Sequence, residues 1–405
     1  VLGANAPSNR ITLGLIGCGG QGTGNLRNLM NKNGTQAIAV CDPDKNNMNR
    51  AKDHVNKQYA KQTESGEYKG CETFTDYRDL CAMKELDAVI VGTPDHWHAL
   101  ACLESLRNKK DVYCEKPITH LFAEGQAVYK EAAKQKAIFQ VGSQQRSSSR
   151  MRVAAEAVMN GVLGKIKEVK VGLPTGGGTN EEGKVAQPIP DHLDYDLWCG
   201  PSRLLPFHPK RLHWNWRWCL DYGGGQLMDW IGHHNDIAHW GLGVELSGPI
   251  RVEAKNFRYP EKGMYNNPVD YEVRSEYEGG YSVVISNKYG GGVRWIGEDG
   301  WVRVSRGQIE ASNKDWIREK TDRGMIKAYN SPDHRRNFVA GVKTRKECIC
   351  PAEIGHRSVT PGHLSFVSDT LKRPLKWDPK NEMIVDDQEA DKLLNKLDYR
   401  GDWAL

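Results

Sequence analysis

The sequence predicts an α/β amino-terminal domain with a doubly wound parallel sheet, followed by an α+β domain with a large, mostly antiparallel open sheet. Short apolar strands alternate with helical stretches up to about residue 145, whereas longer strands with alternating side chains follow residue 160. A chain of 405 residues also exceeds one ordinary hydrophobic core. We therefore expect domains at 10–145 and 146–405, preceded by an export-signal remnant or disordered tail at 1–9.

The first domain begins with a β-branched and leucine-rich strand at 11–16, a glycine turn and a helix at 23–30. The turn consists of Gly17, Cys18, Gly19, Gly20, Gln21 and Gly22. The next strand, 36–41, is followed by Asp42, twenty residues after Gly22. Glycines at these spacings let a dinucleotide pyrophosphate approach the backbone, and the acid is placed to bind ribose hydroxyls. This order of elements is typical of a Rossmann domain that binds NAD.

Asp42 also favours NAD over NADP, because a carboxylate repels a 2′-phosphate. The same residue could begin a turn before Pro43, and the two roles are compatible. The remaining strands of this domain are expected at 86–91, 111–114 and 137–141, with helices at 98–107 and 123–134.

The tripeptide Glu115-Lys116-Pro117 directly follows the strand at 111–114. In open α/β sheets ligands bind at the carboxyl edge, so Lys116 is expected beside a bound cofactor. The alternative is a solvated lysine in a turn that ends at proline.

In the second domain the pattern changes to longer alternating strands beyond a linking helix at 151–160. Its strands are expected at 166–173, 251–257, 271–277, 281–287, 292–296 and 301–305. The segment 174–215 has little regular pattern, and a connection of that length is usually a functional loop or lid.

A polar helix face is expected at 226–241, directly after three glycines. Asp229, His233, Asp236 and Trp240 are spaced by four, three and four residues, so they share one side of the helix. Such a face beside a glycine turn suits a catalytic helix whose end approaches a ligand closely. The alternative is a surface pair between Asp229 and His233.

The composition limits the partners of this chain. A net charge of +5 without a block of basic residues gives no footprint for nucleic acid or a membrane surface, and no apolar run approaches the ~20 residues that cross a bilayer. The ten cysteines show neither a CxxC pair nor a Cys/His ligand spacing, so no metal site is expected. Residues 1–6 look like the end of an export signal, which favours a periplasmic or secreted location over the cytoplasm; an arbitrary chain boundary is the alternative.

The motifs, in their order and spacing, resemble the Gfo/Idh/MocA oxidoreductase family over nearly the whole chain. They are the glycine turn, Thr93-Pro94 with His98, Glu115-Lys116-Pro117, and Asp229 with His233 four residues on. The stretches 92–98, 223–234, 295–301 and 350–358 resemble the secreted bacterial branch, which is exported by a Tat-type signal and includes glycoside 3-dehydrogenases. One departure is Gly362-His363, where that branch has Cys-His.

The resemblance implies an NAD-dependent sugar dehydrogenase that retains its cofactor and forms a homodimer or homotetramer through the open sheet. It places catalysis at Lys116, Asp229 and His233. The expected cofactor-binding residues are Gly17, Gly19, Gly20, Gln21, Gly22, Asp42, Thr93, Pro94, Asp95, His98, Glu115, Lys116 and Gln144. The expected substrate-binding residues are Arg146, Trp218 and His234, in a cleft that Trp97, Trp198, Trp214 and Trp216 also line.

Three functions remain open at this point. The first is oxidation of a sugar or glycoside hydroxyl, such as C3 of a glucoside, with His233 as base and Lys116 stabilising the alkoxide. The second is a redox-assisted glycosidase that oxidises, eliminates, hydrates and reduces; His234, Asp236 or Tyr222 could supply its additional acid or base. The third is a non-catalytic sugar-binding protein, since a fold alone does not establish function.

Overall fold

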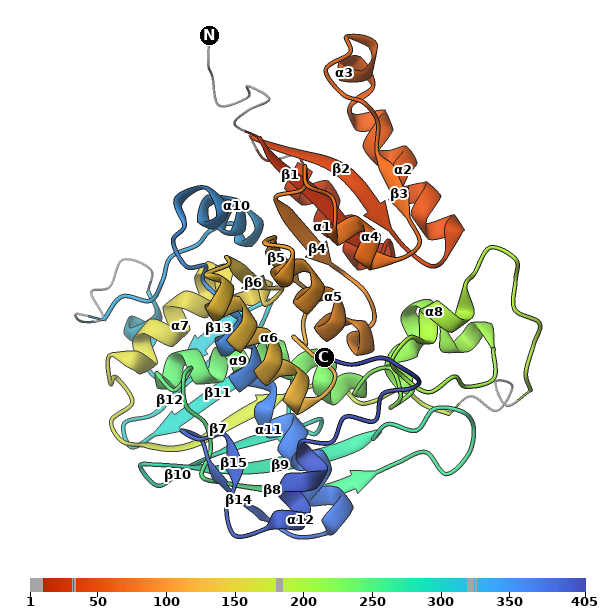
Figure 1. Ribbon diagram of the computed structural model, residues 1–405. Helices are drawn as coiled ribbons and strands as arrows, with labels where there is room; N and C mark the ends of the chain where they lie inside the picture. Colours follow the sequence, from red (N-terminus) through yellow and green to blue (C-terminus); the bar gives the residue numbers. More distant parts are fainter. Residues whose placement is uncertain (1–9, 31, 33, 180–184, 319–323, 325) are drawn as a thin grey trace.

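Two sheets organise the molecule in the computed structural model, which describes residues 10–405 except 31, 33, 180–184, 319–323 and 325 (Figure 1). One sheet has six strands and the other nine. The tail expected at residues 1–9 lies outside the described residues. The predicted fold class is confirmed: a Rossmann-type domain with a parallel sheet precedes a domain with a mostly antiparallel sheet.

The six-stranded sheet is entirely parallel and has the order β3-β2-β1-β4-β5-β6. Its strands are β1 (Ile11–Ile16), β2 (Thr35–Cys41), β3 (Glu72–Phe74), β4 (Ala88–Val91), β5 (Asp111–Cys114) and β6 (Phe139–Val141). Its helices are α1 (Gly20–Met30), α2 (Lys45–Gln58), α3 (Ala60–Glu64), α4 (Tyr77–Cys81), α5 (Asp95–Arg107) and α6 (Phe122–Gln135). The strand order reverses between β1 and β4, and ligands bind at such a switch point in doubly wound sheets.

Both faces of this sheet are buried. In β4, Val89 and Val91 belong to one hydrophobic cluster, whereas Ala88 and Ile90 belong to another. Alternate side chains of a strand point to opposite faces, so each face contributes to a core. The hydrophobic cluster that contains Val91 extends through the second domain as far as Trp295. This shared core joins the two domains into one body.

The nine-stranded sheet has the order β13-β12-β11-β7-β10-β9-β8-β14-β15, and only β7 and β10 pair in parallel among its described strands. Its strands are β7 (Ile166–Gly172), β8 (Arg251–Arg258), β9 (Asp270–Tyr277), β10 (Tyr281–Ser286), β11 (Gly292–Gly297), β12 (Trp301–Val304), β13 (Ile309–Ala311), β14 (Leu375–Asp378) and β15 (Met383–Ile384). The helices of this half are α7 (Ser149–Met159), α8 (Tyr195–Cys199), α9 (Gly225–Leu242), α10 (His334–Thr344), α11 (Ala352–Leu371) and α12 (Gln388–Leu394). Helix α9 packs against α7, α11 and β11, between the two sheets.

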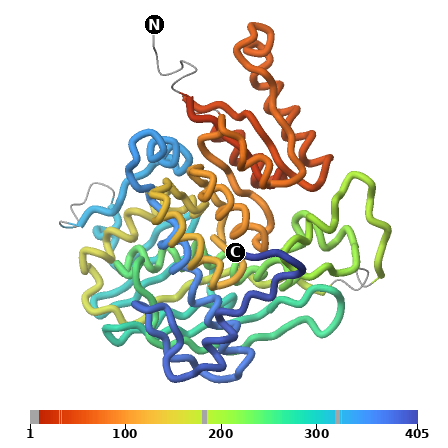
Figure 2. The backbone as a smooth tube through the Cα atoms, viewed as in Figure 1, coloured from red at the N-terminus to blue at the C-terminus, as the bar shows by residue number. Residues whose placement is uncertain are grey.

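Parts of the second half of the chain return to the first domain. Helix α10 lies beside β6 rather than with the other late elements (Figure 1). Phe338 of α10 packs edge-on against Tyr113 of β5, with ring centroids 5.7 Å apart, and the side-chain amide of Gln140 donates to the carbonyl oxygen of His334 at 2.7 Å. The carboxyl-terminal segment runs from the late helices toward the 185–220 region (Figure 2), where the N–H of Arg400 donates to the carbonyl oxygen of Pro201 at 2.8 Å.

Three further observations concern the sequence-based expectations. All ten cysteines are buried and free of disulfide bonds. Among the described residues, no group of His, Cys, Asp and Glu is arranged to hold a metal ion. Each described helix is too short or too polar to span a membrane.

Candidate active site

A cavity of about 1440 Å³ lies between the carboxyl edge of the parallel sheet and the start of α9. Gly17, Asp42, Thr93 and Glu115 line it from the ends of β1, β2, β4 and β5, and Asp229 lines it from α9. Typical ligand pockets measure roughly 300–1,000 Å³. The cavity is therefore large enough for a dinucleotide and a second molecule.

The glycine turn provides the close backbone approach that a pyrophosphate needs. Gly17 has a φ of +89°, and a Cβ there would come within 2.6 Å of the Thr93 nitrogen. A Cβ at Gly22 would overlap the carbonyl oxygen of Gly17, so only glycine lets α1 pack this close to β1. Among the described residues, apart from the glycines' own neighbours in the chain and helix, no atom lies within 4 Å of a Cβ at Gly19 or Gly20, both of which line the cavity. The open side of the turn thus faces the space where phosphates bind at a helix N-terminus.

Asp42 is held by two backbone donors at the end of β2. Its carboxylate accepts hydrogen bonds from the N–H of Cys18 at 2.7 Å and of Asp44 at 2.8 Å. Burial raises the pKa of Asp42 to about 7, despite these two hydrogen bonds, which lower it. Each carboxylate oxygen has a second lone pair, so Asp42 can still accept ribose hydroxyls from the cavity.

Glu115 connects three segments around the cavity. Its Oε1 accepts hydrogen bonds from the side-chain amides of Gln21 at 3.0 Å, Asn25 at 2.7 Å and Gln144 at 3.0 Å. Gly142 packs so closely that a Cβ there would lie 2.8 Å from this carboxylate. The network fixes the backbone that carries Lys116 at the cavity wall.

The start of α5 contributes one unpaired hydroxyl and one fully engaged histidine. Oγ1 of Thr93 is buried and has no hydrogen-bond partner among the described residues, and Thr93 itself lines the cavity. His98 instead holds the loop together, with Nδ1 2.7 Å from the carbonyl oxygen of Pro117 and Nε2 3.1 Å from that of Thr93. Pro94 occupies the N-cap position without a side-chain hydrogen bond, and Asp95 follows as a buried carboxyl whose pKa burial raises well above its usual value.

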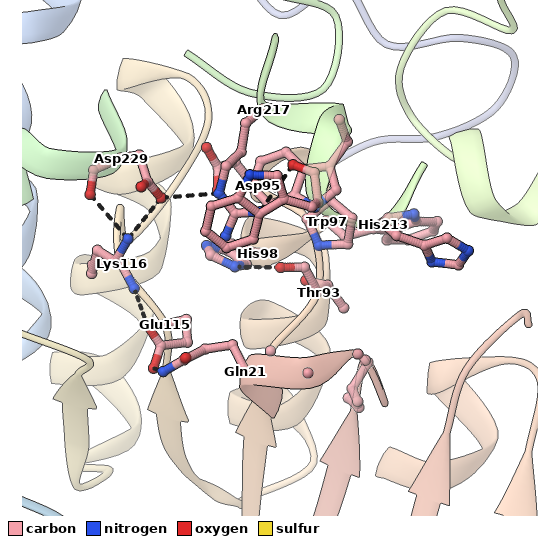
Figure 3. A pocket seen from close by; sticks show the side chains of 18 of the residues that line it. Gln21, Thr93, Asp95, Trp97, His98, Glu115, Lys116, His213, Arg217 and Asp229 are labelled. Carbon is pink, nitrogen blue, oxygen red and sulfur yellow. Dashed lines mark hydrogen bonds and ion pairs between the residues drawn. The ribbon is translucent and has the colours of Figure 1, made fainter. Parts of the chain in front are cut away.

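Lys116 and Asp229 form an ion pair across the two domains (Figure 3). Nζ of Lys116 donates to Oδ1 of Asp229 at 2.7 Å and to its carbonyl oxygen at 3.0 Å, and Nε of Arg217 reaches the same Oδ1 at 3.3 Å. Burial alone would raise the pKa of Asp229, but the charges of Lys116 and Arg217 outweigh it and hold that pKa below its usual value. An ammonium group has three donors, so one N–H of Lys116 remains for a ligand.

His233 lies one helical turn after Asp229 and lines the same cavity. Its Nδ1 is buried and has no partner among the described residues. Burial, followed by the charge of Lys116, lowers the pKa of His233 well below 6.5. The imidazole is therefore neutral near pH 7 and can accept a proton. Asp229 pairs with two cations instead of with His233, which excludes the surface-pair alternative for this helix.

Comparison with protein-family models decides the family. Residues 11–143 match the NAD-binding Rossmann fold of the Gfo/Idh/MocA oxidoreductases, and residues 149–405 match the carboxyl-terminal alpha/beta domain of the same family. This chain belongs to the Gfo/Idh/MocA oxidoreductase family. It is accordingly an NAD-binding oxidoreductase of the Gfo/Idh/MocA type, which confirms the predicted cofactor.

Curated relatives match part of the chain. An inositol 2-dehydrogenase from Rubrobacter xylanophilus is 31% identical over 159 residues, which are 39% of this chain and 42% of that protein. A glycosyl hydrolase family 109 protein from Shewanella baltica is 31% identical over 119 residues, which are 29% of this chain and 25% of that protein. The aligned region thus spans less than half the length of either relative.

Solved structures match nearly the whole fold of this Gfo/Idh/MocA member. The WlbA dehydrogenase from Chromobacterium violaceum, crystallised with NADH and UDP-GlcNAcA, superposes with a TM-score of 0.68 at 18% identity, covering 93% of this chain and 99% of that one. The WlbA dehydrogenase from Bordetella pertussis gives 0.65 at 17% identity, with 91% and 99% covered. Identities this low show the fold alone.

The polar groups and the open glycine turn of the cavity fit NAD. The open glycine turn suits the pyrophosphate, Asp42 suits ribose hydroxyls, and the unpaired Oγ1 of Thr93 lies near the end of β4. The predicted cofactor contacts that line the cavity are Gly17, Gly19, Gly20, Gln21, Asp42, Thr93, Pro94, Asp95, His98, Glu115, Lys116 and Gln144. Gly22 acts instead through the packing of α1 on β1.

The three predicted substrate-binding residues lie outside the cavity lining, so their contact with a substrate stays a prediction. Arg146 is fully buried in a bidentate ion pair with Asp236, with both N–O distances 2.7 Å. Trp218 packs into a buried cluster that consists mainly of residues from the 185–220 segment. His234 is turned toward the large sheet, where Nδ1 donates to the carbonyl oxygen of Gly172 at 2.7 Å. Each of the three residues lies next to a cavity-lining residue in the sequence or on its helix, but its own side chain contacts residues inside the protein.

Other cavity residues were not predicted from the sequence. Arg217 stacks between the rings of Trp214 and Trp216, 4.3 and 4.4 Å from their centroids, while it binds Asp229. The unpredicted charged residues of the lining include Asp44, Arg50, Arg217, Arg306 and Arg335. The predicted aromatic lining of Trp97, Trp198, Trp214 and Trp216 is present. An isolated arginine carries no sequence motif, so only the fold brings these side chains to the cavity.

Proposed function

We propose that this protein is an NAD-dependent dehydrogenase that oxidises a hydroxyl of a sugar or glycoside, with C3 of a glucoside as the first position to test. The observation that carries the proposal is the meeting of Lys116, Asp229 and His233 at one wall of a cavity that also contains the glycine turn. A base, a charge-assisted donor and a nicotinamide site are what oxidation of an alcohol requires.

The chain supplies the proton chemistry. The imidazole of His233 lines the cavity and is neutral near pH 7, so it takes the proton of the substrate hydroxyl. The remaining N–H of Lys116 donates to the oxygen as negative charge develops on it, and Asp229 keeps Lys116 in position. NAD⁺, when bound, accepts the hydride from the carbinol carbon.

The aromatic lining supports a sugar as the substrate. Sugars present apolar faces that stack on rings and hydroxyls that need fixed polar partners. Trp214 is 65% exposed at the cavity and is held in place by Arg217 stacked against its ring. The relative named inositol 2-dehydrogenase and the WlbA complex with UDP-GlcNAcA point to polyol and sugar chemistry within the family.

The position of the 185–220 segment is an argument for the part of the proposal in which the cofactor is retained and recycled. It is tied by backbone hydrogen bonds to the turn after β2: the N–H of Lys45 donates to His192 at 2.9 Å, and that of Asp194 donates to Pro43 at 3.0 Å. These contacts lie beside Asp42, so the segment covers the end of the cavity assigned to the adenosine ribose.

An oligomer formed through the open sheet, implied by the family resemblance, belongs to the same proposal.

A panel of polyols, glucosides and their C3 epimers tests the proposal. Purified protein with a confirmed stoichiometry of bound NAD is mixed with each compound, and NADH and keto-sugar are measured. We expect NADH formation with a subset of sugars. Cofactor-loaded protein that oxidises no polyol or glycoside would overturn the proposal.

The second candidate is a redox-assisted glycosidase. The similarity to glycosyl hydrolase family 109 proteins and to an alpha-N-acetylgalactosaminidase from Shewanella oneidensis favours it. This reaction needs a group that moves the proton at C2, and His234, Asp236 and Tyr222 lie outside the cavity lining. Asp95, a buried carboxyl that lines the cavity, fits that task better. Release of free aglycone without net NADH would distinguish this candidate from the dehydrogenase.

A further inference from the structure

Arg306 is a cavity-lining guanidinium to which the proposed oxidation gives no task. It lies on the exposed turn between β12 and β13, which is closed by a hydrogen bond from the N–H of Ser305 to the carbonyl oxygen of Gln308 at 2.9 Å. Its guanidinium carbon lies 4.5 Å from the centroid of the Trp230 ring. The hairpin and the indole therefore fix where this positive charge stands.

Arg306 differs from Lys116 and Arg217 in its pairing. Neither a hydrogen bond nor an ion pair joins this side chain to any residue that the structure describes. The other two cations at this end of the cavity, Lys116 and Arg217, both bind Asp229. Arg306 thus brings to the cavity a guanidinium that no described carboxylate binds directly, although the charge of Asp229 acts on it from a distance.

The same charge stands close to the reaction centre. Trp230, on which Arg306 stacks, lies edge-on to His233 with ring centroids 5.7 Å apart. The guanidinium also contributes, after burial and Lys116, to the lowered pKa of His233. A group bound by Arg306 would therefore belong to the molecule whose hydroxyl His233 deprotonates.

We propose that Arg306 binds a carboxylate of the substrate, so that the sugar oxidised here is a uronate or a glycoside of a uronate. This inference rests on the proposed sugar dehydrogenase function. A guanidinium presents its donors in a planar fork that matches the two oxygens of a carboxylate, and stacking on an indole leaves the edge of that fork available. A phosphate dianion usually engages several donors, and Lys116 and Arg217 already bind Asp229, so Arg306 favours the carboxylate.

Paired substrates test the proposal. Methyl glucuronide, methyl glucoside and glucose 6-phosphate are compared as substrates of the NAD-loaded wild-type protein and of Arg306→Gln. A hydrogen-bonded charge contributes about 1.5–3 kcal/mol, which corresponds to roughly a 10–150-fold lower KM for the glucuronide than for the glucoside. Arg306→Gln should bring the two KM values together, and Arg306→Lys should retain part of the difference. Arg303→Gln is the matched control, because Arg303 pairs with Glu310 on the same hairpin.

Equal KM values for glucuronide and glucoside in the wild type, an unchanged preference in Arg306→Gln, or a preference for the phosphate ester would each overturn the inference. Calorimetric titration of the same three compounds into NADH-loaded protein separates this outcome from failure of the proposed function. Arg306-dependent binding of glucuronide without oxidation of any sugar would sustain the carboxylate site and refute the dehydrogenase. Oxidation of glucosides without a preference for the carboxylate would sustain the dehydrogenase and refute the carboxylate site. Absence of both binding and oxidation would refute both hypotheses.

Discussion

Replacing Asp229 by Asn removes the carboxylate that both Lys116 and Arg217 bind, while it keeps the shape of the side chain. The side chains of Lys116 and Asp229 are only 12% and 11% exposed. Removing one partner of a buried ion pair costs about 3–5 kcal/mol, because the other charge stays desolvated without compensation. For domains of this size about 1 kcal/mol shifts the unfolding midpoint by roughly 2–4 °C, so Asp229→Asn should lower it by roughly 6–20 °C.

Differential scanning calorimetry of the NAD-free protein measures this shift. The matched control is Lys376→Gln, which breaks the pair with Asp386; both of those side chains are more than two-thirds exposed. Exposed pairs contribute about 0–1 kcal/mol, so the control should shift the midpoint by at most about 4 °C. Dehydrogenation by Asp229→Asn should also fall by about 10²–10³, the cost of misplacing one donor to the developing oxyanion. An unchanged or higher midpoint together with wild-type turnover would refute the role assigned to this pair.

Three further outcomes follow from the cavity. Gly22→Ala should abolish NAD binding in a calorimetric titration, because its Cβ overlaps Gly17, whereas Gly24→Ala, with no atom within 4 Å, should bind normally; equal affinities would contradict the packing argument. NAD affinity should rise as the pH increases through about 7, because the raised pKa of Asp42 leaves its carboxyl protonated below that pH and ionised, able to accept ribose hydroxyls, above it; a flat profile in the wild type would count against this. With NAD kept saturating, the acid limb of kcat/KM for the sugar should lie below pH 6.5, because the lowered pKa of His233 keeps the base neutral down to that pH; a limb at or above pH 7 under that condition would exclude His233 as the base.

The parallel sheet could be predicted because its strands are buried on both faces and read as short apolar runs between glycine turns. Helix α2 (Lys45–Gln58) could not, because it buries only Asn47, Ala51 and Val55 and has no apolar stripe. Helix α11 (Ala352–Leu371) could not be predicted either, for the opposite reason. It is buried nearly all round and contains Pro361, so neither amphipathic spacing nor helix propensity marks it.

Local periodicity brings the motif residues to the cavity, but it does not say where the side chains of their sequence neighbours lie. Lys116 follows a strand at the ligand-binding edge, and Asp229 and His233 share a helix face, so local periodicity places them. His234 is adjacent to His233 in sequence but points about 100° away around the helix, toward the sheet. Arg306 reaches the cavity from a hairpin of the second domain, and only the tertiary fold brings it there.

Single-turnover hydride transfer tests the central claim most directly. Wild-type protein, Lys116→Ala and His233→Ala are loaded with equal amounts of NAD⁺, confirmed by calorimetry, and mixed with the sugar that the panel identifies. The account predicts that NADH forms rapidly in the wild type and at least about 10³-fold more slowly in both variants, because the donor and the base act in the transition state. Variants that bind NAD⁺ normally and still form NADH at the wild-type rate would contradict it.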